Sequence, residues 1–194
     1  MEPESKAMKD NPQNAEAENG HPDLNGIREH TQHYLKDLIY GANDGIITTF
    51  AVVAGVVGAG LSTRTILILG FANLVADGFS MGASNFLSIR SDEAVREEQG
   101  LKPREPHAVR HGIATFLAFL VIGVIPLLSY LVPFIPRSFS TAATVTLLTL
   151  FAVGAARSMV TEKGWWASGL EMLLVGATAA AVAYGIGGFV SGLT

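Results

Sequence analysis

The stretch GFANLVADGFSMGASNFLSIR, residues 70–90, decides how this chain folds. It is long enough to cross the ~30 Å hydrocarbon core of a bilayer as one α-helix. It nevertheless contains polar or sulfur-bearing side chains every four residues, which would line one slowly drifting face of that helix: Asn73, Asp77, Met81 and Asn85. A carboxylate within a membrane span is costly and usually faces a polar cavity. Asp77 therefore marks a candidate functional site.

The composition indicates an integral membrane protein. The 194 residues are 49% hydrophobic and only 15% charged, with a mean hydropathy of +0.36, whereas soluble domains carry about 25% charged residues. The sequence contains no cysteine, which excludes disulfides, iron–sulfur clusters and thiolate metal sites. The whole net charge of −4 comes from residues 1–35, which hold seven acidic and three basic residues. Residues 1–33 have almost no large apolar side chains, so we expect a disordered acidic cytoplasmic tail.

Five apolar segments follow, each long enough for a transmembrane helix. We expect an all-α integral membrane domain over residues 34–192, with a kink at Pro126 and spans near residues 37–60, 65–90, 109–132, 139–160 and 166–190. Lys and Arg are enriched in cytoplasmic loops. A cytoplasmic N-terminus places eleven of these residues inside and two outside. The predicted topology therefore has the N-terminus in the cytoplasm, the C-terminus outside, and a short cytoplasmic loop at residues 91–108.

The first span contains a second carboxylate, Asp44. It lies eight residues into the span from Lys36, which corresponds to a depth of ~12 Å. Met81 lies nine residues into the second span from Arg90, or ~13 Å, and Asp77 lies one turn deeper at ~20 Å. We therefore expect Asp44 and Met81 to lie at about the same depth in the membrane.

These side chains form a plausible ligand set for a transported metal ion. Carboxylate oxygens suit hard and borderline divalent ions, and a thioether favours softer ones. Asn43, Asn73 and Thr48 would add oxygen atoms, and the set suits Fe²⁺, Mn²⁺ or Co²⁺ better than Mg²⁺. One chain offers few ligands for a six-coordinate ion, so water or a second copy in a homodimer would complete the sphere. A proton would compete with the metal for the carboxylates, which is the basis of metal–proton exchange. We expect no resident cofactor, because the metal is the substrate.

The predicted loop contains acids that could capture metal from the cytoplasm. Glu93 and Glu97 are one turn apart if the second span continues as a helix, and Glu98 is adjacent. His107 and His111 have the same spacing before the third span. Five interspersed basic residues favour an ordinary solvated loop instead.

Three motifs resemble those of the vacuolar iron transporter family, which includes nodulin-21-like proteins and many bacterial members. They are YGANDG at residues 40–45, FSMG at 79–82, and Gly154 together with YGIG at 184–187. The resemblance covers about residues 33–192. It implies a five-helix, dimeric exporter of Fe²⁺ or Mn²⁺ from the cytosol, coupled to protons, in which Asp44 and Met81 match the transport site.

The chain departs from the iron-storing eukaryotic members in two places. Those members carry a long, Glu- and Met-rich helical metal-binding domain between spans two and three, where this chain has only residues 91–108. They also have Glu at the position of Asn73 and no acid at the position of Asp77. The carboxylate of the second span therefore lies one turn further along in this chain.

Two other functions are open. Asp44 and Asp77 on adjacent spans could be the catalytic pair of an intramembrane aspartyl protease, although Asp77 lacks the Gly-x-Gly-Asp signature. A non-transporting membrane scaffold or assembly factor would need neither carboxylate. We expect that the protein is not an enzyme and does not bind nucleic acid. Its expected partners are divalent metal ions, protons, lipid and a second copy of the chain. No organelle-targeting segment is evident, which favours a bacterial cytoplasmic membrane over a vacuolar one. Glu171 could face the pathway or pair with Arg157.

Overall fold

The computed structural model describes residues 24–134, 136, 138–158 and 164–193, and no strand occurs among them. The helices are α2 (Leu24–Gly58), α3 (Thr63–Glu98), α4 (Ala108–Gly123), α5 (Ile125–Leu131), α6 (Phe139–Arg157) and α7 (Trp165–Ser191). The prediction of an all-α protein is confirmed. The chain divides into two units, residues 1–33 and 34–194. α2 begins within the predicted tail, whose residues 1–23 lie outside the described part.

In the described part of the chain, four helices are long and apolar enough to cross a membrane, namely α2 from Tyr34 onward, α3, α6 and α7. α4 and α5 provide a fifth span if they are taken together, with a bend of 42° between them. Pro126 lies in the first turn of α5, next to this bend, as expected for a residue that cannot continue the hydrogen-bond ladder. α3 has 36 residues, or about 54 Å, so its charged end extends beyond a ~30 Å hydrocarbon core.

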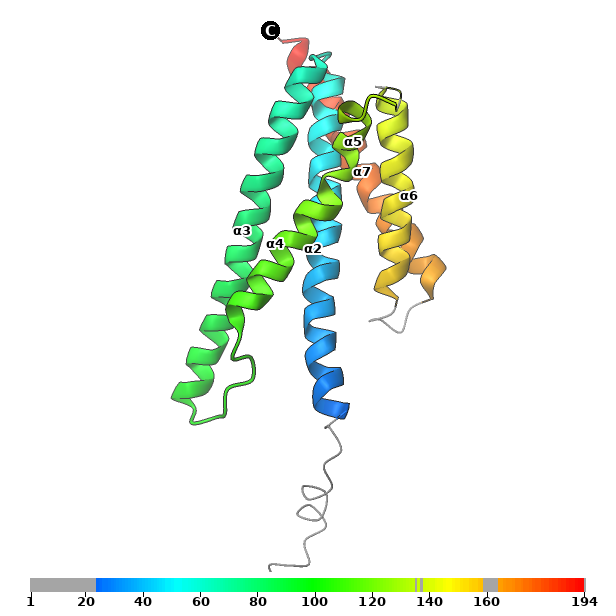
Figure 1. Cartoon of the computed structure of the whole chain (residues 1–194). Coiled ribbons are helices and arrows are strands. Elements are labelled where there is room, and N and C mark those ends of the chain that lie inside the picture. The colour runs from blue at the N-terminus through cyan, green and yellow to red at the C-terminus, as the bar shows by residue number, and fades with distance from the viewer. Residues whose placement is uncertain (1–23, 135, 137, 159–163, 194) are drawn as a thin grey trace, which may run out of the picture. The chain divides into compact units, whose positions relative to one another are not determined.

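A tight turn makes α2 and α3 antiparallel neighbours (Figure 1). Gly60 in this turn has a φ of 68°, a left-handed conformation that glycine adopts without steric cost. Ser62 then caps α3, because its hydroxyl oxygen accepts a hydrogen bond from the Thr65 N–H at 3.3 Å. The turn therefore fixes the register of the two helices that carry the predicted site.

Within residues 34–194, α2 lies between the α3–α4 pair and the α6–α7 pair (Figure 1). Val53 of α2 is fully buried in a cluster with Leu127 of α5. Ile46 of α2 is fully buried against Leu150 of α6 and Met172 of α7. Because α2 is packed on both sides, the rotation of its polar face is set by the core.

Glycines bring α4 into backbone contact with both α2 and α3. A Cβ atom at Gly45 of α2 would overlap the backbone of Phe119 on α4, and one at Gly82 of α3 would lie 2.7 Å from the carbonyl oxygen of Gly112 on α4. Small residues allow such close approach between membrane helices. The glycines of the first two spans thus serve packing within one chain.

Candidate functional site

The structure has a carboxylate on each of two neighbouring spans. Asp44 of α2 and Asp77 of α3 are both half-buried, and they lie on the two antiparallel helices of one hairpin. Asp44 lies sixteen residues before Gly60 and Asp77 sixteen residues after Leu61. In an antiparallel pair, residues equally far from the turn lie at similar levels.

Met81 lies one helical turn beyond Asp77 on the same face of α3 and is half-buried. From the ends of the spans, the sequence predicted that Met81 would lie level with Asp44. The register from the turn instead places Asp77 opposite Asp44, with Met81 one turn nearer the charged end of α3. The three residues therefore define a short polar stretch along the two helices rather than a single level.

Two asparagines beside the carboxylates have buried polar atoms without partners. Among the described residues, the side-chain oxygen of Asn43 and the side-chain nitrogen of Asn73 accept or donate no hydrogen bond. A buried polar atom without a partner is costly and calls for water, an ion or another ligand. Asn43 directly precedes Asp44, and Asn73 lies one turn before Asp77. These atoms are therefore available to a polar guest beside the two carboxylates.

Thr48 lies one turn beyond Asp44 and is also half-buried. Its hydroxyl donates to the backbone carbonyl of Asp44 at 2.8 Å. This hydrogen bond consumes the hydroxyl proton and leaves the oxygen lone pairs for an ion or a water molecule. The geometry is thus compatible with the predicted role of Thr48 as an additional oxygen ligand.

Within the described residues, no group of three or more His, Cys, Asp or Glu side chains is placed to hold a metal ion. The two carboxylates of one chain would have to be supplemented by amide oxygens, the thioether, water or a second copy.

The three acids at the charged end of α3 have different surroundings. Glu93 accepts hydrogen bonds from the backbone N–H groups of Arg104 at 3.0 Å and Glu105 at 2.8 Å. Glu97 and Glu98 are exposed. Glu93 therefore closes the loop that follows α3, which argues against its predicted part in metal capture, whereas Glu97 and Glu98 remain candidates.

A second polar cluster, which was not predicted from the sequence, lies where α2, α4 and the loop between α3 and α4 meet. His111 of α4 contacts the carboxylates of Asp37 and Glu105 through its two ring nitrogens. From the sequence, His111 was noted only for its spacing from His107, and residues 91–108 were interpreted as a solvated loop. Asp37 could have been noticed, because it lies two helical turns before Asp44 on the same face of α2.

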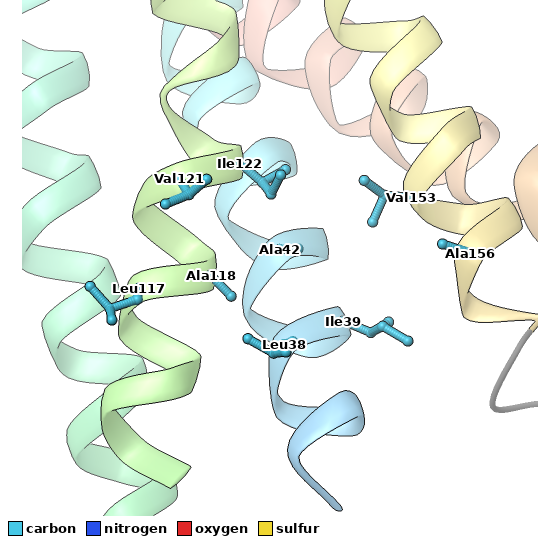
Figure 2. A pocket seen from close by; sticks show the side chains of 9 residues that line it. All are labelled: Leu38, Ile39, Ala42, Leu117, Ala118, Val121, Ile122, Val153 and Ala156. Carbon is cyan, nitrogen blue, oxygen red and sulfur yellow. The ribbon is translucent and has the colours of Figure 1, made fainter. Parts of the chain in front are cut away.

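One ion pair and one apolar pocket involve none of the predicted transport residues of α2 and α3. Arg157 of α6 lies 3.9 Å from Glu171 of α7, which gives Glu171 a structural neighbour. A pocket of about 400 Å³ opens between α2, α4 and α6, and Figure 2 shows that only apolar side chains line it: Leu38, Ile39, Ala42, Leu117, Ala118, Val121, Ile122, Val153 and Ala156. None of the predicted transport residues contributes to this pocket.

The long apolar helices define a multi-pass α-helical membrane protein, and two of these helices each contain a half-buried carboxylate. The sequence matches the VIT family over residues 35–99 and 91–188. The chain belongs to this family. The two matched segments overlap at residues 91–99, within the predicted short loop at residues 91–108.

The relatives are named as transporters. A vacuolar iron transporter of Toxoplasma gondii is 26% identical over 221 aligned positions, covering 79% of this chain and 73% of the relative. One of Plasmodium falciparum is 28% identical, covering 79% and 81%, and vacuolar iron transporter 2 of Oryza sativa is 25% identical, covering 82% and 91%. The Toxoplasma alignment is longer than the 194 residues of this chain, so that relative contains residues with no counterpart here. Family membership supports a transporter and not an enzyme.

Proposed function

We propose that this protein transports a divalent transition metal ion, Fe²⁺ or Mn²⁺, out of the cytosol in exchange for protons. The proposal is supported by the similarity to proteins named vacuolar iron transporters. The single observation that carries it is that the α2–α3 hairpin has a carboxylate in each of its two membrane-spanning helices, Asp44 and Asp77, at similar distances from the turn. Two like charges at such a depth are unfavourable unless a cation or a proton occupies the space between them.

The mechanism follows from this charge balance. With the metal bound, both carboxylates are ionised, and the thioether of Met81 and the amide of Asn43 supplement the oxygen ligands. When the metal leaves, protons neutralise the carboxylates, which lowers the cost of keeping them in the membrane. Exchange of one occupant for the other couples metal movement to a proton gradient.

A second copy of the chain would complete the site. Asp44, Asp77 and Met81 are only half-buried within one chain, and a carboxylate facing lipid would be costly. A homodimer that joins the α2–α3 faces of two copies would cover these residues and double the ligands. We propose the cytoplasmic membrane of a bacterium as its location, where outward transport would lower the metal content of the cell.

The test is metal uptake into liposomes that contain the purified full-length protein, with Fe²⁺, Mn²⁺, Co²⁺ and Zn²⁺ offered under opposite pH gradients. Asp44→Asn preserves the shape of the side chain and removes its charge, so it should abolish uptake. Asp92→Asn is the matched control, because Asp92 is an exposed acid at the charged end of α3.

The proposal is supported if uptake of Fe²⁺ or Mn²⁺ is faster under one pH gradient than under the opposite one. Uptake should also fail in Asp44→Asn and persist in Asp92→Asn. Uptake that ignores the pH gradient refutes proton exchange. A folded, inserted Asp44 variant that still protects cells from excess metal refutes the transport site and favours a scaffold.

A further inference from the structure

The cluster formed by Asp37 of α2, His111 in the first turn of α4 and Glu105 of the loop before α4 is almost completely enclosed. The side chain of His111 is 3% exposed, that of Asp37 16% and that of Glu105 13%. Nδ1 of His111 contacts Oδ2 of Asp37, and Nε2 lies 3.2 Å from Oε2 of Glu105. The ring of Tyr34 stacks on the imidazole, with centroids 4.2 Å apart and planes 4° apart. The imidazole therefore links α2 to the loop between α3 and α4.

Neutral groups hold the cluster in place. Asn85 of α3 donates to Asp37 at 2.9 Å and to the hydroxyl of Thr115 on α4 at 2.8 Å. That hydroxyl donates in turn to the backbone carbonyl of His111 at 3.0 Å. Among the side chains that the structure describes, the titratable groups in contact with the imidazole are Asp37 and Tyr34 from α2 and Glu105 from the loop, whereas α3 and α4 contribute the amide and the hydroxyl.

The number of protons in this cluster determines how many of its contacts are favourable. A neutral imidazole has one N–H group and can donate to only one of the two carboxylates. Its other nitrogen would then direct a lone pair at a carboxylate oxygen, which is repulsive. Both contacts are hydrogen bonds only when the cluster holds one further proton, and charge-assisted hydrogen bonds of this kind are strong. One proton thus decides whether Glu105 is attracted to His111.

The same geometry does not suit a metal ion. Asp37 and Glu105 contact opposite nitrogens of the ring, so the three side chains surround the imidazole rather than a common point. No metal-holding group of three such side chains occurs in the described parts of the chain, this cluster included. The ligand that fits is a proton.

The cluster lies on the helix faces that carry the proposed transport site. Asp37 precedes Asp44 by seven residues, or two helical turns, and Asn85 follows Met81 by four residues, or one turn. Both steps lead toward the end of the α2–α3 hairpin that is opposite its turn. This is the end where α3 becomes charged and where the loop returns to α4.

We propose that Asp37, His111 and Glu105 form a proton-binding site separate from the intramembrane carboxylates, and that its proton holds the α3–α4 loop against α4. With the proton bound, Glu105 is attached to His111. Without the proton, the contact of Glu105 with His111 becomes repulsive and this attachment of the loop is lost, while Glu93 still accepts the two hydrogen bonds of the loop backbone. A role in metal–proton exchange rests on the proposed function, whereas proton binding and loop attachment do not.

The test uses the full-length protein in lipid nanodiscs without metal, followed from about pH 5 to about pH 9, the range that brackets histidine titration. The ring ¹⁵N signals of its five histidines report protonation, and the signal that disappears in His111→Gln identifies His111. Amide hydrogen exchange of residues 99–107, corrected for its intrinsic pH dependence, reports loop attachment. His107→Gln is the matched control, because His107 is exposed and makes no capping hydrogen bond.

Two substitutions of Glu105 should have opposite effects. In Glu105→Gln, the amide can donate to the unprotonated Nε2 while Nδ1–H donates to Asp37, so loop exchange should stay slow up to the highest pH. In Glu105→Ala, Glu93 still accepts the two backbone hydrogen bonds of the loop, so loop exchange should be faster than in the wild type at low pH and should no longer depend on the protonation of His111. In the wild type and in His107→Gln, it should rise several-fold as the His111 ring loses its second proton. Both Glu105 variants leave Asp37 and His111 in place, so they remain informative if His111→Gln fails to fold.

A His111 signal that does not change with pH refutes the proton site. Loop exchange that depends on pH in the same way in Glu105→Gln as in the wild type refutes the attachment by Glu105. These measurements need no transport, so a wild-type protein that moves no metal in liposomes would refute the proposed function and leave this result unaffected.

Discussion

The side-chain amide of Asn85 donates to the carboxylate of Asp37 at 2.9 Å, across 48 residues of sequence. This hydrogen bond joins α3 to α2 on the side of Asp44 and Asp77 that is away from the turn. Gly60 and Ser62 fix the turn itself. The two helices are therefore held on both sides of the carboxylates.

We expect Asn85→Ala to destabilise the protein by about 1.5–3 kcal/mol, the usual worth of a hydrogen bond to a charged group. The loss arises because the carboxylate of Asp37 and the hydroxyl of Thr115 each lose the amide partner. Thermal unfolding in detergent measures the change. Ser84→Ala is the control, since Ser84 precedes Asn85 and is exposed. Equal melting temperatures for the two variants would contradict this role of Asn85.

The contact between α2 and α4 gives a second prediction. An added Cβ at Gly45 would overlap the backbone of Phe119, which cannot move aside as a side chain can. We expect Gly45→Ala to destabilise the fold by about 1–3 kcal/mol despite the better helix propensity of alanine. Gly185→Ala in α7 meets no atom within 4 Å and should be neutral or slightly stabilising. The ratio of folded to aggregated protein after graded heating compares the two.

The helices could be predicted from sequence because apolar runs of ~20 residues have few other stable structures in a membrane. The predicted span 139–160 corresponds to α6 (Phe139–Arg157), and the predicted span 166–190 corresponds to α7 (Trp165–Ser191). The start of α2 at Leu24 was not predicted, because residues 24–33 have the polar composition of a solvated terminus. Periodicity also could not show that Gly45 and Gly82 face α4, since it identifies a face but not its neighbour.

Candidate site residues could be predicted from the sequence only where a polar side chain lay inside a membrane span. Asp44 and Asp77 were selected because a carboxylate in a span is exceptional, and the structure places them on the two helices of one hairpin. The contact between Asp37 and His111 was missed, since these two residues are 74 residues apart. No local motif encodes such a contact, which arises only when α4 packs back on α2.

A third prediction concerns the loop after α3. Glu93 accepts hydrogen bonds from two consecutive backbone N–H groups, those of Arg104 and Glu105. We expect Glu93→Ala to accelerate amide exchange at these two residues by at least tenfold, which corresponds to about 1.4 kcal/mol of lost protection. Glu97→Ala, one turn along α3 and exposed, should leave their exchange unchanged. If both variants exchange as the wild type does, Glu93 does not close the loop.

The last prediction separates a sulfur ligand from a core methionine. Met81→Leu keeps the side-chain volume and removes the thioether, so the fold should tolerate it. Because sulfur favours softer ions, uptake of Fe²⁺ should fall by roughly tenfold relative to Mn²⁺, or about 1.4 kcal/mol of binding free energy. Competition between the two ions in liposomes measures this ratio.

Met172→Leu provides the control for this prediction. Met172 is buried against Ile46 and Leu150 in the core, so its replacement changes packing without touching the polar face of α2 and α3. It should leave the ratio of Fe²⁺ to Mn²⁺ uptake unchanged even where it lowers stability slightly. A shift in the ratio of the same size in both variants would mean that packing, and not the sulfur of Met81, sets the preference for the ion.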